Sequence, residues 1–157
     1  MSLVTLAEAK LHLRVTDSAE DALIAVYITA AEQRAVSALD RNVYVDGTAL
    51  QTAKTAAPAA LTAATVAKEA AVAAAEAMTD STEKVAALQV AETAYMRALV
   101  AYRQAFDGIV GNDQIKAAVL LTVGSLYAQR EDVVVGTSVA ALPNGAGYLL
   151  QPFKVYA

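Results

Sequence analysis

Residues 5–41 read TLAEAKLHLRVTDSAEDALIAVYITAAEQRAVSALDR, and the spacing of their apolar residues predicts two consecutive helices. The first helix is expected to run from Leu6 to about Arg14. Thr5 and Glu8 have the spacing of a capping box, in which each side chain binds a free backbone N–H at the helix start. This stretch therefore begins with a well-marked helical turn.

The second helix is expected to begin after the polar residues 16–18, any of which can cap it, and to reach about Leu39. Glu20 and Asp21 would lie in its first turn, where the helix dipole favours negative charge. Its apolar sector is wide, so it is expected to contact more than one neighbouring element. The main apolar face consists of Ile24, Ile28, Ala31, Ala35 and Leu39.

A short extended piece, VYVDG at residues 43–47, is followed by an abrupt shift to an alanine-rich composition. We expect one helix with Pro58 in its first turn that ends near Met78, and a second helix that is capped by Asp80 and ends near Phe106. Two long helices joined by a few polar residues form an antiparallel hairpin. The alternative is that both helices belong to a single four-helix bundle.

The two helices of this hairpin have complementary faces. Bulky residues form a stripe on the second helix, and smaller residues on the first can approach them closely. The bulky stripe is Leu88, Tyr95, Leu99, Tyr102 and Phe106. The facing residues on the first helix are Leu61, Ala64, Val72 and Ala75.

After a break at Gly108, Gly111 and Asn112, Asp113 is expected to cap a helix that runs to about Glu131. Its sequence IKAAVLLTVGSLY is apolar on nearly every side, which predicts the most buried helix of the protein. Gly124 in its middle is explained if another backbone passes close by.

The C-terminal part is predicted to be less regular. Residues 133–142, VVVGTSVAAL, are expected to form a strand or an extended segment between subunits. Residues 143–157, PNGAGYLLQPFKVYA, contain a turn and then a last apolar stretch. The predicted fold class is therefore all-α, with residues 1–47 and 108–157 as a small core domain and residues 48–107 as an inserted helical hairpin.

Composition argues against several kinds of site. The 157 residues include no cysteine and one histidine, His12, so neither a disulfide framework nor a metal site is expected. No glycine-rich phosphate loop and no nucleophile motif is visible, so we predict a protein that is not an enzyme and has no cofactor. No apolar run is long enough for a membrane span, and no leader sequence is indicated.

Three segments resemble the head-tail connector (adaptor, head-completion) proteins of long-tailed bacteriophages. They are the quoted opening at residues 5–41, IKAAVLLTVGSLYAQRE at residues 115–131, and ALPNGAGYLLQPFKVY at residues 141–156. The alanine-rich block between them departs from the family pattern. The resemblance implies a small helical connector domain and a homo-oligomeric ring, typically a dodecamer, beneath the portal of the capsid.

The implied function is structural. The ring would extend the DNA channel and offer a docking platform to a head-closure or tail protein, and it would reside in the virion after assembly in the host cytoplasm. DNA would pass without sequence-specific binding, which agrees with the net charge of −4 and the scattered basic residues. No membrane partner is implied.

Two interface sites are expected on this basis. A docking segment for the portal or an adjacent subunit would consist of Tyr148, Leu149, Leu150, Pro152, Phe153 and Tyr156. The alternative is that Leu149, Leu150 and Phe153 only cover the core of their own subunit. Arg130 and Glu131 would form a salt bridge between subunits, or would simply be solvated charges.

Other functions stay open from the sequence alone. The chain could be a head-closure or tail-terminator protein, although such proteins tend to be rich in strands. It could also be a cellular helical adaptor that binds partner helices through an alanine-rich groove.

Overall fold

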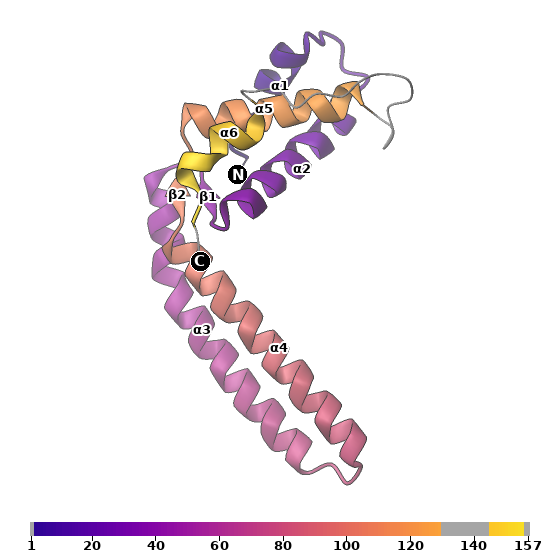
Figure 1. Ribbon diagram of the computed structural model, residues 1–157, viewed down its shortest axis with the longest axis vertical. Coiled ribbons are helices and arrows are strands. Elements are labelled where there is room, and N and C mark those ends of the chain that lie inside the picture. Colours follow the sequence, from indigo (N-terminus) through magenta and orange to yellow (C-terminus); the bar gives the residue numbers. More distant parts are fainter. Residues whose placement is uncertain (1, 130–144, 156–157) are drawn as a thin grey trace. The chain divides into compact units, whose positions relative to one another are not determined.

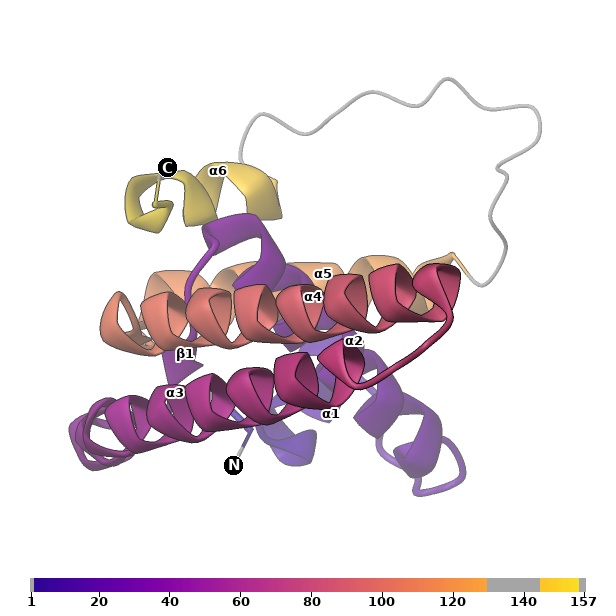
Figure 2. The same ribbon diagram turned by 90° about the horizontal axis from the view of Figure 1, so that it is seen from below.

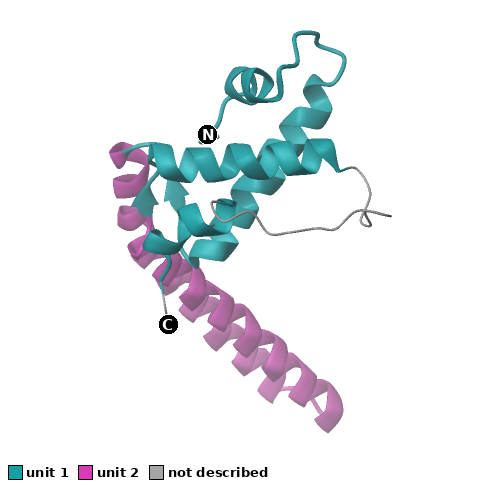
Figure 3. Cartoon of the chain, turned by 45° about the horizontal axis from the view of Figure 1, so that its top comes forward, with its two compact units in different colours: residues 1–46, 109–157 teal, residues 47–108 magenta. Residues whose placement is uncertain are grey.

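The computed structural model describes residues 2–129 and 145–155, and the fold within them is all-α (Figure 1). The chain divides into two compact units, residues 1–46 with 109–157 and residues 47–108 (Figure 3). The first unit contains the helices α1 (Leu6–Leu13), α2 (Asp21–Leu39), α5 (Asp113–Ala128) and α6 (Ala146–Leu150). It also contains the short strands β1 (Val43–Tyr44) and β2 (Ile109–Val110) and the 3-10 helix η1 (Gln151–Phe153). The second unit is the helical hairpin of α3 (Gly47–Glu76) and α4 (Ser81–Phe106).

The start of α1 confirms the predicted capping box. The backbone N–H of Glu8 donates to the Thr5 hydroxyl at 3.2 Å, and the backbone N–H of Thr5 donates to the Glu8 carboxylate at 2.8 Å. The helix ends at Leu13, and its C-cap residue Arg14 has a left-handed backbone with a φ of 59°. The N–H of Arg14 donates to the carbonyl of Leu11. This left-handed residue turns the chain away from the helix axis.

The predicted apolar face of α2 is confirmed, but its predicted start is wrong. All five residues of that face are buried. The helix begins at Asp21 with Glu20 as its N-cap residue, and no side chain caps it. Asp17 instead accepts the backbone N–H of Ala19 at 2.9 Å, so its carboxylate stabilises the preceding turn and does not cap the helix.

Asn112, and not the predicted Asp113, caps α5. Its side-chain oxygen accepts the backbone N–H of Ile115 at 2.9 Å, which leaves Asp113 as the first helical residue. The helix ends at Ala128, which is short of the predicted end at Glu131. Its C-cap Gln129 has an extended backbone whose N–H still bonds the carbonyl of Ser125.

Only one side of α5 is covered within the first unit, although its sequence is apolar on nearly every side. The buried residues are Ile115, Ala118, Val119 and Val123, whereas Leu121 is 39% exposed. The helix packs this side against the buried face of α2, and together they form most of the core. A helix sequence that is apolar on every side therefore does not show which side is buried in the monomer.

A parallel two-residue pairing of β1 and β2 joins the ends of the first unit's two sequence segments. Val43 pairs with Ile109 and Tyr44 pairs with Val110. The extended piece after α2 was predicted, but its partner strand was not, because two residues give no periodic signal. Gly111 follows β2 directly and lies close to the Leu3 side chain. A Cβ atom at this position would be 2.2 Å from that side chain, so the space suits a glycine.

The predicted hairpin is present, but α3 starts earlier than expected. Pro58 lies inside α3, about three turns after its first residue, Gly47. An interior proline loses one backbone hydrogen bond and costs about 3 kcal/mol, which is why a first-turn position was predicted. The turns before Pro58 are held by packing against the end of α4, where Ala57 and Ala105 are each 8% exposed.

The facing stripes of the hairpin are confirmed with one exception. Figure 1 and Figure 2 both show α3 and α4 side by side along their length. Asp80 caps α4 by accepting the N–H groups of Thr82 and Glu83, at 2.7 and 2.9 Å. The predicted residues of both stripes are at least half-buried except Phe106, which is 41% exposed and stacks on Tyr102 with 4.7 Å between ring centroids.

Replacement of a core leucine should destabilise the first unit. Leu39 is fully buried at the end of α2, so Leu39→Ala should lower the free energy of unfolding by about 2–5 kcal/mol. Urea unfolding followed by circular dichroism measures this change. Leu11→Ala is the matched control, because Leu11 is 81% exposed and its replacement should change the value by less than about 0.5 kcal/mol. Equal losses in both variants would contradict the described core.

Candidate assembly interface

The predicted docking segment is partly core and partly surface. Leu150 is 7% exposed within the core cluster, and Leu149 and Phe153 pack against that cluster. Tyr148, in contrast, is 66% exposed, and Pro152 is also exposed. Leu149, Leu150 and Phe153 therefore help to cover the core of their own subunit, whereas Tyr148 and Pro152 are exposed.

The segment is held in place by a backbone bond as well as by its apolar side chains. The N–H of Val155 donates to the carbonyl of Leu39, the C-terminal residue of α2, at 3.0 Å. This bond satisfies one of the carbonyl groups that a helix end leaves without a partner. Tyr156 and the predicted salt bridge between Arg130 and Glu131 lie outside the described residues, as does the segment at residues 133–142 that was expected to be extended.

A groove of about 580 Å³ opens on the first unit, mainly along α2. Its walls are Leu3 near the N-terminus, polar and apolar residues of α2, two valines around β1, and two residues of α5. The α2 residues are Thr29, Glu32, Gln33, Ala35, Val36 and Ser37, and the others are Val43, Val45, Ile115 and Val119. The groove is thus lined by the chain before α1, by α2, by residues in and next to β1 and by α5.

Glu32 fixes one wall of this groove. Its Oε1 atom accepts the hydroxyl of Ser2 at 2.6 Å and the backbone N–H groups of Leu3 and Val4 at 2.7 and 3.0 Å. These bonds hold the chain before α1 against α2 and bury Val4, which is 1% exposed. Sequence reasoning missed this role, because a glutamate on the polar side of a helix predicts only solvent exposure.

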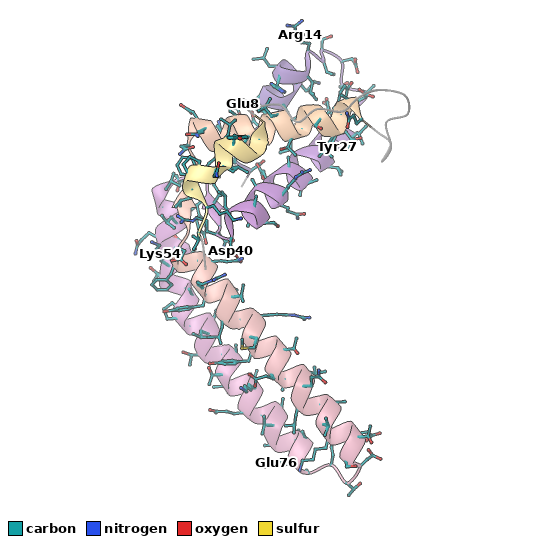
Figure 4. The ribbon with its side chains drawn as sticks, viewed as in Figure 1. Glu8, Arg14, Tyr27, Asp40, Lys54 and Glu76 are labelled. Carbon is teal, nitrogen blue, oxygen red and sulfur yellow. The ribbon has the colours of Figure 1, made fainter. Side chains whose placement is uncertain are left out.

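Ionic contacts fasten α1 to the two core helices. Lys116 of α5 donates to the Glu8 carboxylate at 2.7 Å, and Lys10 donates to Asp21 of α2 at 2.6 Å (Glu8 is labelled in Figure 4). The hydroxyl of Tyr127 donates to Glu20 just before α2. Charged side chains along one side of the first unit therefore set the position of α1 relative to α2 and α5.

The bond from Lys116, reinforced by bonds from Thr5, lowers the pKa of Glu8 from 4.5 to about 2. Folding thus favours the ionised carboxylate. Its contribution to stability is complete above pH 4.5 and is lost as the pH falls toward 2.

His12 has a packing contact in this arrangement. Its Nε2 atom would lie 3.2 Å from a Cβ atom placed on Gly124, so the imidazole ring rests above the glycine of α5. The predicted reason for Gly124, close passage of another backbone, is therefore wrong, because a side chain takes that space. Over residues 2–129 and 145–155, no group of three or more His, Cys, Asp or Glu residues could hold a metal ion.

The family model for Phage gp6-like head-tail connector protein matches residues 3–87, which is more than half of the chain. The chain belongs to this connector family. The family has a structural role in the phage neck, and its membership implies assembly with head and tail proteins and a place in the virion. The comparisons with curated proteins and with solved structures gave no match.

The extent of the match adds to what the sequence indicated. The first of the three connector-like segments lies inside the matched range, whereas the other two lie beyond it. The range also includes α3 and the first residues of α4. The likeness to connectors is therefore not confined to the two ends of the chain. In the part of the chain that the structure describes, no helix combines the length and hydropathy required to span a membrane.

Titration of Glu8 tests the link between α1 and α5. The Glu8 carboxyl, followed by NMR, should titrate with a midpoint near 2, and Lys116→Met should raise its pKa toward 4.5 because the largest stabilising bond is gone. Lys54→Met on the hairpin is the control and should leave the midpoint unchanged. An unchanged midpoint in Lys116→Met would contradict the ion pair.

Proposed function

We propose that copies of this chain form a homo-oligomeric ring between the portal and the next head-closure or tail protein of a phage neck. Membership of the connector family is the observation that carries this proposal. The ring would extend the DNA channel and serve as a docking platform. Its role is structural and not enzymatic, and it needs no cofactor.

The surface of the first unit supports a role in assembly. The groove along α2 is concave, and large apolar side chains stand exposed on several elements, namely Leu11 at 81%, Val26 at 61% and Tyr148 at 66%. Single exposed apolar residues are common on monomers, but aromatic residues such as tyrosine are enriched at protein interfaces. In a ring, neighbouring copies or the portal would cover them.

The C-terminal segment supplies the proposed docking point. Leu150 and Phe153 anchor the segment in the core, so Tyr148 and Pro152 are presented on a rigid base. Rigid presentation limits the entropy that binding must overcome. Tyr148 and Pro152 are therefore the proposed contacts to the portal or to an adjacent subunit. Tyr156 is a further proposed contact of the same segment. Arg130 and Glu131 are proposed to form a salt bridge between neighbouring copies.

The charge balance agrees with a channel that lets DNA pass. A protein that grips DNA neutralises phosphates with clustered Lys and Arg, whereas this chain has a net charge of −4. A ring with this composition would enclose DNA without holding it. Residues 2–129 and 145–155 contain only two strands of two residues each, which does not favour the strand-rich head-closure and tail-terminator alternatives.

A head-joining assay tests the docking point. DNA-filled heads that lack this protein would be mixed with the purified chain, and bound chain would be measured after sedimentation. Tyr148→Ala should reduce joining about tenfold or more, because loss of a central aromatic contact costs about 1.4 kcal/mol or more of binding free energy.

Tyr148→Phe is the matched control and should join heads nearly as well as the unchanged chain, since it keeps the aromatic contact area. The circular dichroism spectrum should be the same for all three proteins, because Tyr148 lies outside the core. Full joining by a folded Tyr148→Ala variant would overturn the docking point, and failure of the unchanged chain to bind heads would overturn the proposed function.

A further inference from the structure

One side of the helical hairpin carries an apolar groove, here called the alanine groove. Toward the connection between the helices it has a volume of about 570 Å³ and is lined by Ala64, Ala67, Lys68, Ala71, Ala74, Met78, Ala87, Val90, Ala91, Ala94 and Tyr95. Toward the other end it continues as a hollow of about 330 Å³. That hollow is lined by Ala53, Ala56, Ala57, Ala60, Leu61, Ala98, Ala101, Tyr102 and Ala105.

The register of this lining is that of a coiled-coil seam. Spacings of four and three residues alternate without a break along both helices, which is the 3.5-residue period that keeps a seam facing a partner helix. On α3 the series is Ala53, Ala57, Ala60, Ala64, Ala67, Ala71 and Ala74, and Met78 continues the spacing just beyond the end of the helix. On α4 it is Ala87, Ala91, Ala94, Ala98, Ala101 and Ala105.

Part of this seam is not used inside the hairpin. Ala57, Ala91 and Ala105 are buried between α3 and α4, but every second alanine on α3 from Ala60 to Ala74 is exposed, as is Val90 at 70%. The charged residue in the lining, Lys68, is engaged, because it pairs with Glu92 and lies 4.5 Å from the Tyr95 ring centroid. A third helix could therefore enter the groove without burying an unpaired charge.

Large apolar side chains are also exposed on another side of the same hairpin. Val85, Met96 and Val100 of α4 are 64%, 51% and 45% exposed. Successive side chains of a helix point about 100° apart around its axis. On α4, these three side chains therefore point on average about 130° away from the exposed groove residues Val90, Ala94 and Ala101. We call these three residues the knob stripe. Large side chains entering a small-residue groove give the interdigitation that close packing requires.

We infer that the alanine groove of one copy receives the knob stripe of α4 from the next copy, so that hairpins of neighbouring copies pack side by side. A groove and a stripe on different sides of one element make a head-to-tail contact, and such contacts generate a closed ring when the rotation between successive copies closes. This inference rests on the proposed ring, and it gives the hairpin a specific part in that ring.

The contact would be large enough to be stable. From Ala53 to Ala74 the groove follows α3 for about 32 Å at 1.5 Å per residue. A strip about 20 Å wide, the breadth of two helices, gives about 640 Å² per partner. Specific interfaces bury about 600–1,000 Å² per partner, so the hairpin contact alone reaches the lower part of this range.

Disulfide trapping tests the contact directly, because the full chain contains no cysteine. Three groove variants, Ala60→Cys, Ala67→Cys and Ala74→Cys, are one heptad apart and exposed. Each would be mixed with Met96→Cys, assembled and oxidised. At least one mixture should give a disulfide-linked dimer on a non-reducing gel, while each variant alone should give none.

The outcomes separate this inference from the proposed function. Dimers formed by groove variants alone would indicate a face-to-face contact and overturn the inference. Rings seen by electron microscopy without a cross-link in any mixture would also overturn it, while the proposed function stands. Absence of any assembly at all concentrations would overturn both.

A charge placed in the groove gives a second, independent test. Ala67→Glu should weaken assembly at least tenfold in sedimentation experiments, because the carboxylate would lose its water at the contact. Ala59→Glu is the matched control, since Ala59 is exposed on the same helix outside the groove lining. Both variants should keep the helical circular dichroism of the unchanged chain. Equal assembly of the two variants would contradict the inference.

Discussion

The packing of α2 against α5 is the contact on which the first unit depends. Ile24, Ile28 and Leu39 of α2 meet Ile115 and Val119 of α5 in the core, and each of these five residues is 5% exposed or less. The hydrophobic effect stabilises such a contact by about 25 cal/mol for each Å² of apolar surface removed from water. The pair is also distant in sequence, so it holds together the two segments of the first unit.

The other elements of the first unit are attached to this pair by specific bonds. Glu8 and Lys10 fasten α1 to both core helices, and Glu32 holds the chain before it. Leu150 and the Val155 N–H seat the C-terminal segment. Because these attachments leave Tyr148 exposed, the stability of the core and the presentation of the proposed docking residue follow from the same arrangement.

Sequence patterns predicted what local physics controls. The capping box at Thr5, the N-cap at Asp80 and the buried face of α2 follow from hydrogen-bonding groups and helical spacing, and they were predicted correctly. Interactions across the fold were not visible. The hydroxyl of Tyr127 on Glu20, the β1–β2 pairing and the contact of His12 with Gly124 each join residues far apart in the chain. Pro58 shows the same limit, because tertiary packing outweighs its local preference.

The sequence predicted which residues make up the candidate site, but not which of them are buried and which are exposed. An apolar C-terminal stretch indicated an interface, yet only the structure separates the anchoring residues Leu150 and Phe153 from the exposed Tyr148. In the hairpin, the regular spacing of the alanines can be read directly from the sequence. Only the structure shows that α3 and α4 leave part of these alanines uncovered.

Electron microscopy of the purified protein is the decisive test of ring formation. Closed rings of one copy number are expected, each with a central channel wide enough for a DNA duplex. A population of monomers or of open filaments, at concentrations where the protein is folded by circular dichroism, would contradict it.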